Sequence, residues 1–224
     1  MAYQMIHLEV AYRLLECLST TKYQILYPAE FILGAVAPDS VHMRSDYEVE
    51  MKVKSHLFEN CGPWGDTQDY EQWILNIQNF FASHVVNRMQ SIERDFALGM
   101  CVHCLTDYCN DLKIWRRLQK ENIPPMDLEF FREAYYPEAR GIDLWLYQNS
   151  SNTHKIMELL ANAEVFDYED MVCATDIEKT KNHLLFTQYA VDQIGIADYR
   201  FLSASFLEDF LESTVKDIIS FLNQ

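Results

Sequence analysis

The sequence predicts an all-α protein, and three observations support this fold class. Apolar residues recur at helical spacing along nearly the whole chain, and the alternation typical of β-strands is nowhere sustained. Glycine and proline number only six each in 224 residues, too few for the many tight turns of a β-sandwich or barrel. Hydrophobic residues make up 49% of the chain and charged residues 23%, a balance typical of a folded globular protein. With no internal repeat and no long linker, we expect one domain over residues 1–224.

The expected helices follow from apolar periodicity and from the residues at their ends. A short helix begins at Pro28, because proline suits the first turn, and it ends at Gly34, before a turn at Pro38. Residues 46–60 are expected to begin as loop and end as helix, and residues 61–66 form the clearest break in the chain. The expected helices span residues 6–18, 27–34, 68–89, 93–119, 128–135, 151–163, 176–194 and 201–222.

The net charge and the termini exclude several classes of protein. Eighteen basic against thirty-four acidic residues give a formal charge of −16, so the chain repels nucleic acids and anionic membrane surfaces. No apolar run approaches the length of about 18 residues needed for a membrane span. The first residues lack the basic and apolar regions of a signal peptide. The six cysteines are therefore expected to be reduced thiols, and the protein is expected to be cytoplasmic.

The segment 96–107 is the first candidate for a functional site. Residues 96–102 carry no charge, so this part of the helix should be buried on all sides. His103 and Asp107 follow at i and i+4 on one face, and Gly99 one turn earlier leaves room for a ligand or a close helix. Such an imidazole and carboxylate could chelate one metal ion. The alternative is a His–Asp ion pair that ties two helices together.

Three further residues could join this pair. His7 lies in an apolar part of the first helix, where a histidine often serves only in the core. Asp39 follows Pro38, a common setting for a turn or cap aspartate, and His56 stands between polar and apolar neighbours. Taken with His103 and Asp107, they make a mixed nitrogen and oxygen ligand set suited to zinc or a similar divalent ion.

The order and local context of these five residues resemble the zinc-dependent phospholipase C family and, more distantly, the zinc-dependent single-strand nucleases. The resemblance covers about the first 115 residues, and its matching segments are His7, residues 33–39, 55–58 and 97–107. It implies an all-α fold of this type. It also implies that Asp39, His56, His103 and Asp107 hold one zinc ion, and that Asp107 bridges to a second ion held by His7.

The resemblance implies a hydrolase acting on phosphoester bonds, chiefly phosphodiesters. A metal-activated water would be the nucleophile, and Asp39 would help to orient it. The substrate would be a small phosphoester or a lipid headgroup. The alternative is a non-catalytic protein that binds a metal or small molecule on the same helical scaffold. An open coordination position would favour the enzyme, whereas closure by protein ligands would favour the alternative.

Departures from the family pattern limit the number of metals. The family adds a histidine shortly beyond the bridging aspartate, then a His-x-x-x-Glu pair. Here no histidine follows Asp107 at that distance, and the only matching pair, His154 and Glu158, comes much later. We therefore expect one or two ions. His42 and Asp111 lie near the other candidates in sequence and could also join the site.

Other residues are assigned structural roles. Cys101 and Cys104 have a metal-like spacing, but packing on the buried helix accounts for them better because there is no second pair. Arg44 and Lys54, close in sequence to Asp39 and His56, could meet a phosphate or lie at the surface.

Overall fold

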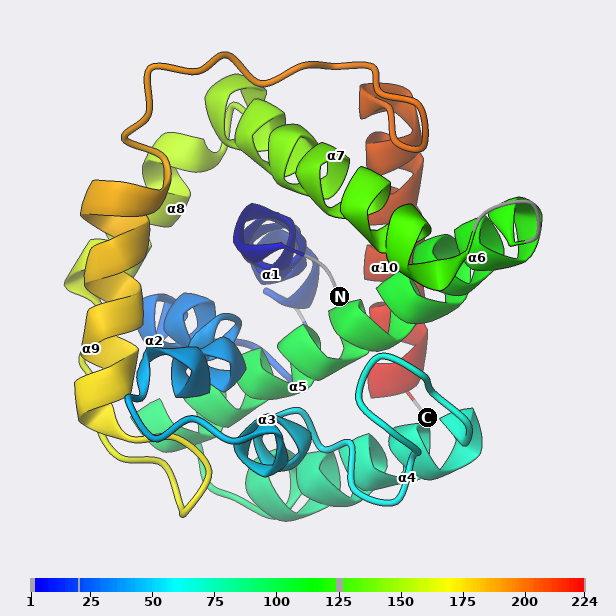
Figure 1. Cartoon of the computed structure of the whole chain (residues 1–224). Coiled ribbons are helices and arrows are strands. Elements are labelled where there is room, and N and C mark those ends of the chain that lie inside the picture. The colour runs from blue at the N-terminus through cyan, green and yellow to red at the C-terminus, as the bar shows by residue number, and fades with distance from the viewer. Residues whose placement is uncertain (1–2, 20, 124–126, 224) are drawn as a thin grey trace.

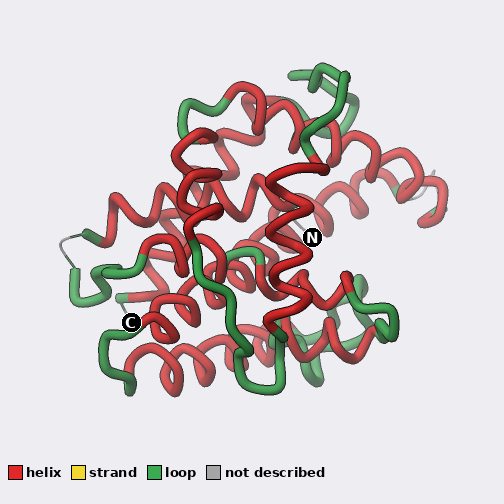
Figure 2. Tube along the Cα trace, turned by 90° about the vertical axis from the view of Figure 1, so that its left-hand side faces the viewer, coloured by secondary structure: helices red, strands yellow, loops and turns green. Residues whose placement is uncertain are grey.

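The computed structural model describes residues 3–19, 21–123 and 127–223, and in this part of the chain all regular structure is helical. Figure 2 shows helices joined by loops, with no strand among the described residues. The all-α prediction is therefore confirmed. The α-helices are α1 (Gln4–Leu18), α2 (Pro28–Gly34), α3 (Val49–Ser55), α4 (Tyr70–Phe81), α5 (Ile92–Asn110), α6 (Arg116–Asn122), α7 (Leu128–Asn149), α8 (Thr153–Asn162), α9 (Ala174–His183) and α10 (Ala204–Leu222).

Short helical segments of other types extend or link these helices. The 3₁₀-helix η1 (Ala37–Met43) replaces the turn expected at Pro38. The π-helical turns η2 (Ala82–Val86), η3 (Asp111–Trp115) and η4 (Leu184–Gln188) directly continue α4, α5 and α9. The long helices predicted over 68–89, 93–119 and 176–194 thus correspond to α-helices with π-turns, and the last of them ends six residues early.

Two further sequence predictions of helix boundaries are wrong. The helix predicted over 128–135 continues to Asn149 because Pro137 is accommodated inside α7. Tyr135, Ala139, Ile142 and Leu146 form one buried stripe on both sides of this proline, and their packing offsets its cost of about 3 kcal/mol.

The second error concerns residues 46–60, which were expected to end as helix. The helix α3 instead occupies the middle of this segment, and the backbone leaves it after Ser55. Leu57 and Asn60 have φ values of 57° and 63°, in the left-handed region that cannot continue a right-handed helix. His56 therefore lies at the C-terminal cap of α3 rather than within a helix.

The helix α5 is the central element of the fold. It contacts α1, α2, α4 and α10, and Figure 1 shows it crossing the molecule below α1. Residues 96–102 are all buried, as their lack of charge predicts. Leu112, in the π-helical turn that follows α5, is substantially exposed. The buried hydrophobic side chains form one cluster that runs from Met5 to Leu222.

The helices α2 and α5 approach each other unusually closely at two glycines. A Cβ placed on Gly34 would lie 2.2 Å from the Phe96 carbonyl oxygen, and one on Gly99 would lie 2.2 Å from the Phe31 carbonyl oxygen. No side chain fits at either position, so glycine is required on both helices. The space expected beside Gly99 is therefore occupied by a neighbouring helix.

The cysteines and the hydrophobicity of the helices agree with expectation. All six cysteines carry free thiols. Burial raises the pKa of the Cys104 thiol, in keeping with a packing role for Cys101 and Cys104. Among the described helices, none is long and apolar enough to cross a membrane.

Asp143 on α7 anchors the start of α1. Its Oδ1 accepts a hydrogen bond from the Ile6 backbone N–H at 3.2 Å, and its Oδ2 accepts one from the Tyr189 hydroxyl at 2.8 Å. The carboxyl is fully buried, and burial raises its pKa to about 7 despite these hydrogen bonds. The folded state therefore holds a proton here between pH 4 and 7, whereas the unfolded chain has lost it.

This raised pKa predicts that stability falls as pH rises through that interval, because the unfolded state binds fewer protons. In urea denaturation with a metal chelator present, this loss from Asp143 opposes the gain in stability that the lowered pKa values of His56 and His103 give between pH 5 and pH 8. Between pH 5 and pH 8, the stability of Asp143→Asn should therefore rise more, or fall less, than that of wild type, since the amide does not titrate. Asp209→Asn, an exposed substitution on α10, is the matched control. Equal pH dependence in Asp143→Asn and wild type would contradict the assignment.

Candidate metal centre

The five candidate ligands come together from four separate elements. His7 lies on α1, Asp39 on η1, His56 at the end of α3, and His103 and Asp107 on α5. Four of the five are buried, and Asp39 is only slightly exposed. Two triads among them, His7–His103–Asp107 and Asp39–His56–His103, each place their ligand atoms within 4.8 Å of one another.

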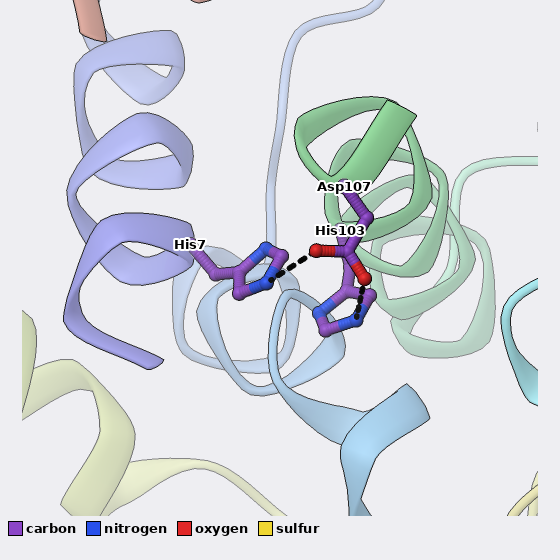
Figure 3. A group of neighbouring side chains, drawn as sticks. All are labelled: His7, His103 and Asp107. Carbon is purple, nitrogen blue, oxygen red and sulfur yellow. Dashed lines mark ion pairs between the residues drawn. The ribbon is translucent and has the colours of Figure 1, made fainter. Parts of the chain in front are cut away.

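The first triad spans α1 and α5, as Figure 3 shows. The rings of His7 and His103 stack with their centroids 3.8 Å apart and their planes inclined by 11°. His7 Nε2 lies 3.4 Å from Asp107 Oδ1, and His103 Nε2 lies 3.9 Å from Asp107 Oδ2. The buried His7 Nδ1 has no hydrogen-bond partner among the described residues.

The second triad extends the cluster toward α3 and η1. The Nε2 atoms of His56 and His103 are 3.1 Å apart, and His56 Nε2 lies 3.2 Å from Asp39 Oδ1. The same nitrogen lies 3.7 Å from Asp107 Oδ2, which links the two triads. A tetrahedral zinc ion with Zn–N distances of 2.0–2.1 Å holds its ligand atoms about 3.3 Å apart. The shortest separations are therefore close to those of a coordination shell.

Backbone carbonyls fix the protonation of the two central imidazoles. His103 Nδ1 lies 2.8 Å from the Ala35 carbonyl oxygen, and His56 Nδ1 lies 3.0 Å from the Lys52 carbonyl oxygen. A carbonyl oxygen only accepts, so Nδ1 carries the proton in both rings and donates it. In the neutral rings both Nε2 atoms then present lone pairs to each other.

Two facing lone pairs repel unless a cation or a proton lies between them. A proton is disfavoured, because burial lowers the pKa of His56 and of His103 despite the nearby carboxylates. A metal ion would satisfy both lone pairs, and Nδ1–H to carbonyl bonds commonly orient metal-binding histidines in this way. The residues present therefore fit a divalent ion, and with two carboxylates and three imidazoles they suit zinc.

Both carboxylates of the cluster are held in the ionised form. Burial raises the pKa of Asp39, but the Lys52 ammonium and the nearby imidazoles outweigh it and leave that pKa well below the ordinary value. Burial likewise acts to raise the pKa of Asp107, and its interaction with His7 reverses the direction. Both groups therefore present charged oxygens, as metal coordination requires.

Lys52 and Gln4 are site residues that the sequence did not reveal. The Lys52 side chain is only 2% exposed, and its Nζ lies 2.9 Å from Asp39 Oδ1 and 5.0 Å from the centre of the Trp64 ring. Gln4 Nε2 donates to Asp39 Oδ2 at 2.7 Å. The available signal for Lys52 was its position four residues before His56, one helical turn away on the same face.

The outlying candidates take different positions. His42 is 41% exposed; its Nε2 lies 2.8 Å from Lys52 Nζ and 3.8 Å from Asp39 Oδ1, at the edge of the cluster. Asp111 is buried and accepts a hydrogen bond from the Tyr70 hydroxyl. His154 and Glu158 are exposed on α8 and belong to neither triad.

The basic residues near the candidates in sequence do not face the cluster. Arg44 pairs with Asp46 and lies near Asp176, and Lys54 pairs with Asp170. Lys52, which lies between them in sequence, is instead the cation beside Asp39.

A carboxylate of the cluster lines each of two cavities. One, of about 270 Å³, is bordered by Asp107, Asp111 and Arg132 together with aromatic rings. The other, of about 280 Å³, is bordered by Asp39, Lys52 and other polar side chains. Tyr136 on α7 lines both cavities. The cluster is therefore not closed off by protein side chains alone.

Comparison of the chain with the profiles of known protein families, with curated proteins and with solved structures finds no match.

The geometry predicts that Asp107→Asn and His103→Ala each lower the zinc bound per chain well below that of wild type. His103 belongs to both triads, whereas Asp107 belongs to the first triad and links it to His56 of the second. Elemental analysis after dialysis into zinc-containing and then zinc-free buffer measures the content, and circular dichroism checks the helices. His154→Ala, which removes an exposed histidine, serves as the control. Unchanged zinc in both site variants would rule out the assignment.

Zinc should also stabilise the fold, because only the folded chain brings the ligands together. At a free zinc concentration 100 times the dissociation constant, the gain is about 2.7 kcal/mol. For a chain of this length that corresponds to an increase in Tm of about 5–10 °C. Thermal unfolding with zinc and with chelator measures the shift, which should be much smaller in Asp107→Asn. A shift of equal size in that variant would place the zinc elsewhere.

Proposed function

We propose that the protein is a metal-dependent phosphoester hydrolase, acting on phosphodiesters in the manner of the zinc-dependent phospholipase C family. The observation that carries this proposal is the pair of imidazole Nε2 atoms 3.1 Å apart, with lone pairs facing each other beside two ionised carboxylates. This arrangement favours a divalent cation. The adjacent cavities favour a catalytic rather than a purely structural site, because substrate and water need an open position.

His56, His103, Asp39 and Asp107 would hold one ion, and His7 with Asp107 would hold a second, looser one. A bound divalent metal supplies polarisation of a phosphoryl oxygen and lowers the pKa of a water molecule. The protein's part is to orient these ligands. The Ala35 and Lys52 carbonyls hold the two imidazoles with Nε2 toward the site.

Asp39 is the residue best placed to orient the attacking water. Its Oδ2 is fixed by Gln4 and its Oδ1 by Lys52, so the carboxylate cannot rotate freely. The Lys52 ammonium also keeps the carboxylate ionised and thus able to accept a hydrogen bond from water. An in-line attack requires such fixed positioning, because misplacement of the nucleophile weakens catalysis sharply.

One observation favours the non-catalytic alternative. Lys52 Nζ already gives Asp39 a cationic partner at 2.9 Å, which lessens the need for a metal at that carboxylate. If Lys52 fills that role permanently, a bound metal would have fewer protein ligands. The site would then keep only a structural or binding function.

Hydrolysis of the chromogenic diester bis(4-nitrophenyl) phosphate distinguishes the two. The zinc-loaded protein should release nitrophenolate, chelation should abolish release, and zinc should restore it. Asp39→Asn should lower the rate per bound metal by about 10²-fold or more, as loss of a positioned proton acceptor does. Asp46→Asn, which replaces an exposed aspartate paired with Arg44, is the matched control. Full zinc occupancy without turnover of diesters would establish the non-catalytic alternative.

A further inference from the structure

Arg132 on α7 occupies an unusual position in the cavity next to Asp107. The cavity wall is rich in aromatic side chains: Phe58, Trp64, Trp73, Trp115 and Tyr136. Its polar groups include two carboxylates and the Arg132 guanidinium. A Cβ placed on Gly65 would lie 3.7 Å from Arg132 Nη2, so the guanidinium lies beside the loop of residues 62–69.

Arg132 has no partner for its charge in the described part of the chain. Its Nε is buried without a hydrogen bond, and no described carboxylate oxygen comes within 4 Å of the side chain's nitrogens. The two buried cations among the described residues, Arg94 and Lys52, pair with Asp95 and Asp39, and the partly buried Arg13 pairs with Glu9 and Glu208.

An unpaired guanidinium in an aromatic cavity calls for an anionic ligand. Placing a charge among apolar groups is costly unless a counter-charge and hydrogen bonds compensate. In a chain with a formal charge of −16, carboxylates are abundant, yet none of those described pairs with this arginine. The planar fork of arginine matches the paired oxygens of a phosphoryl group, and such charge-assisted bonds are strong.

We propose that Arg132 is the substrate-binding residue that holds a phosphoryl oxygen of the ester and of the phosphate product. This inference rests on the proposed function. A phosphoryl group in this cavity would have both Asp107, a proposed ligand of the metal, and the Arg132 guanidinium in its lining. The aromatic rings would exclude water and so strengthen the charge-assisted hydrogen bonds. With only one or two ions at the site, Arg132 supplies further positive charge for the phosphoryl oxygens.

The tryptophans make binding measurable without turnover. The chain has four, and three of them, Trp64, Trp73 and Trp115, line this cavity. In a Trp145→Phe background, all tryptophan fluorescence therefore comes from the cavity wall. Titration of the zinc-loaded protein with inorganic phosphate should give a saturable change in fluorescence.

Arg132→Gln should raise the dissociation constant for phosphate about 10-fold or more, with zinc content and Tm unchanged. Arg132→Lys should bind with intermediate affinity, because lysine keeps the charge and loses the fork. Arg140→Gln removes an exposed arginine from the same helix and should bind phosphate as the background protein does. In diester hydrolysis, Arg132→Gln should raise KM much more than it lowers kcat.

Equal phosphate affinity in Arg132→Gln and the background protein would overturn the inference, as would a background protein that binds no phosphate. If Arg132→Gln fails to fold, Arg132→Lys decides in the same way, since affinity equal to the background would show that the fork is not used. Arginine-dependent phosphate binding without hydrolysis would support Arg132 and refute the hydrolase. Diester hydrolysis together with phosphate binding that does not depend on Arg132 would support the hydrolase and refute the role of Arg132.

Discussion

The close crossing of α2 and α5 is the constraint on which the rest of the candidate site depends. Gly34 and Gly99 let the two backbones meet where a Cβ on either would lie 2.2 Å from a carbonyl oxygen of the other helix. This approach carries the Ala35 carbonyl to within 2.8 Å of His103 Nδ1, which sets the tautomer of that ring. The chain then continues directly into η1 and delivers Asp39 to the same place. One packing contact thus fixes both the orientation of a nitrogen ligand and the position of an oxygen ligand.

The local part of the site could be predicted from the sequence, because helical periodicity is a local property. The uncharged run before His103 predicted burial on all sides, and the i, i+4 spacing placed Asp107 on the same face. The meeting of His7, Asp39 and His56 with that pair is a long-range property that spacing alone does not contain. It was expected because the order of these residues resembles a known family.

The features that were missed depend on tertiary packing. Lys52 is buried because it lies in α3, which ends at Ser55, and its side chain packs against Asp39. From the sequence, the helix in this segment was expected to lie nearer residue 60. The helix α7 continues through Pro137 because a continuous apolar stripe packs against α1 and neighbouring elements. The rule that proline ends a helix considers local sequence alone and does not include this packing energy. Arg132 lies on the same helix, beside Gly65 from a loop 67 residues earlier, so its surroundings could not be read from its neighbours in sequence.

The two sides of the candidate site differ in whether their charged groups are paired within the protein. Toward η1, Asp39 is balanced by an internal ammonium group and fixed by an amide, so its geometry persists whether or not a metal is bound. Toward α7, Asp107 borders an aromatic cavity whose guanidinium has no internal counter-charge among the described residues. Asp39, held by two hydrogen-bond donors, has a fixed orientation and so suits the positioning of a water molecule, which needs a fixed acceptor. An unpaired cation suits an incoming anion, which must supply the missing charge itself. Under the proposed function, the distribution of paired and unpaired charge would give the two cavities different roles and would orient a phosphoester across the candidate metal centre.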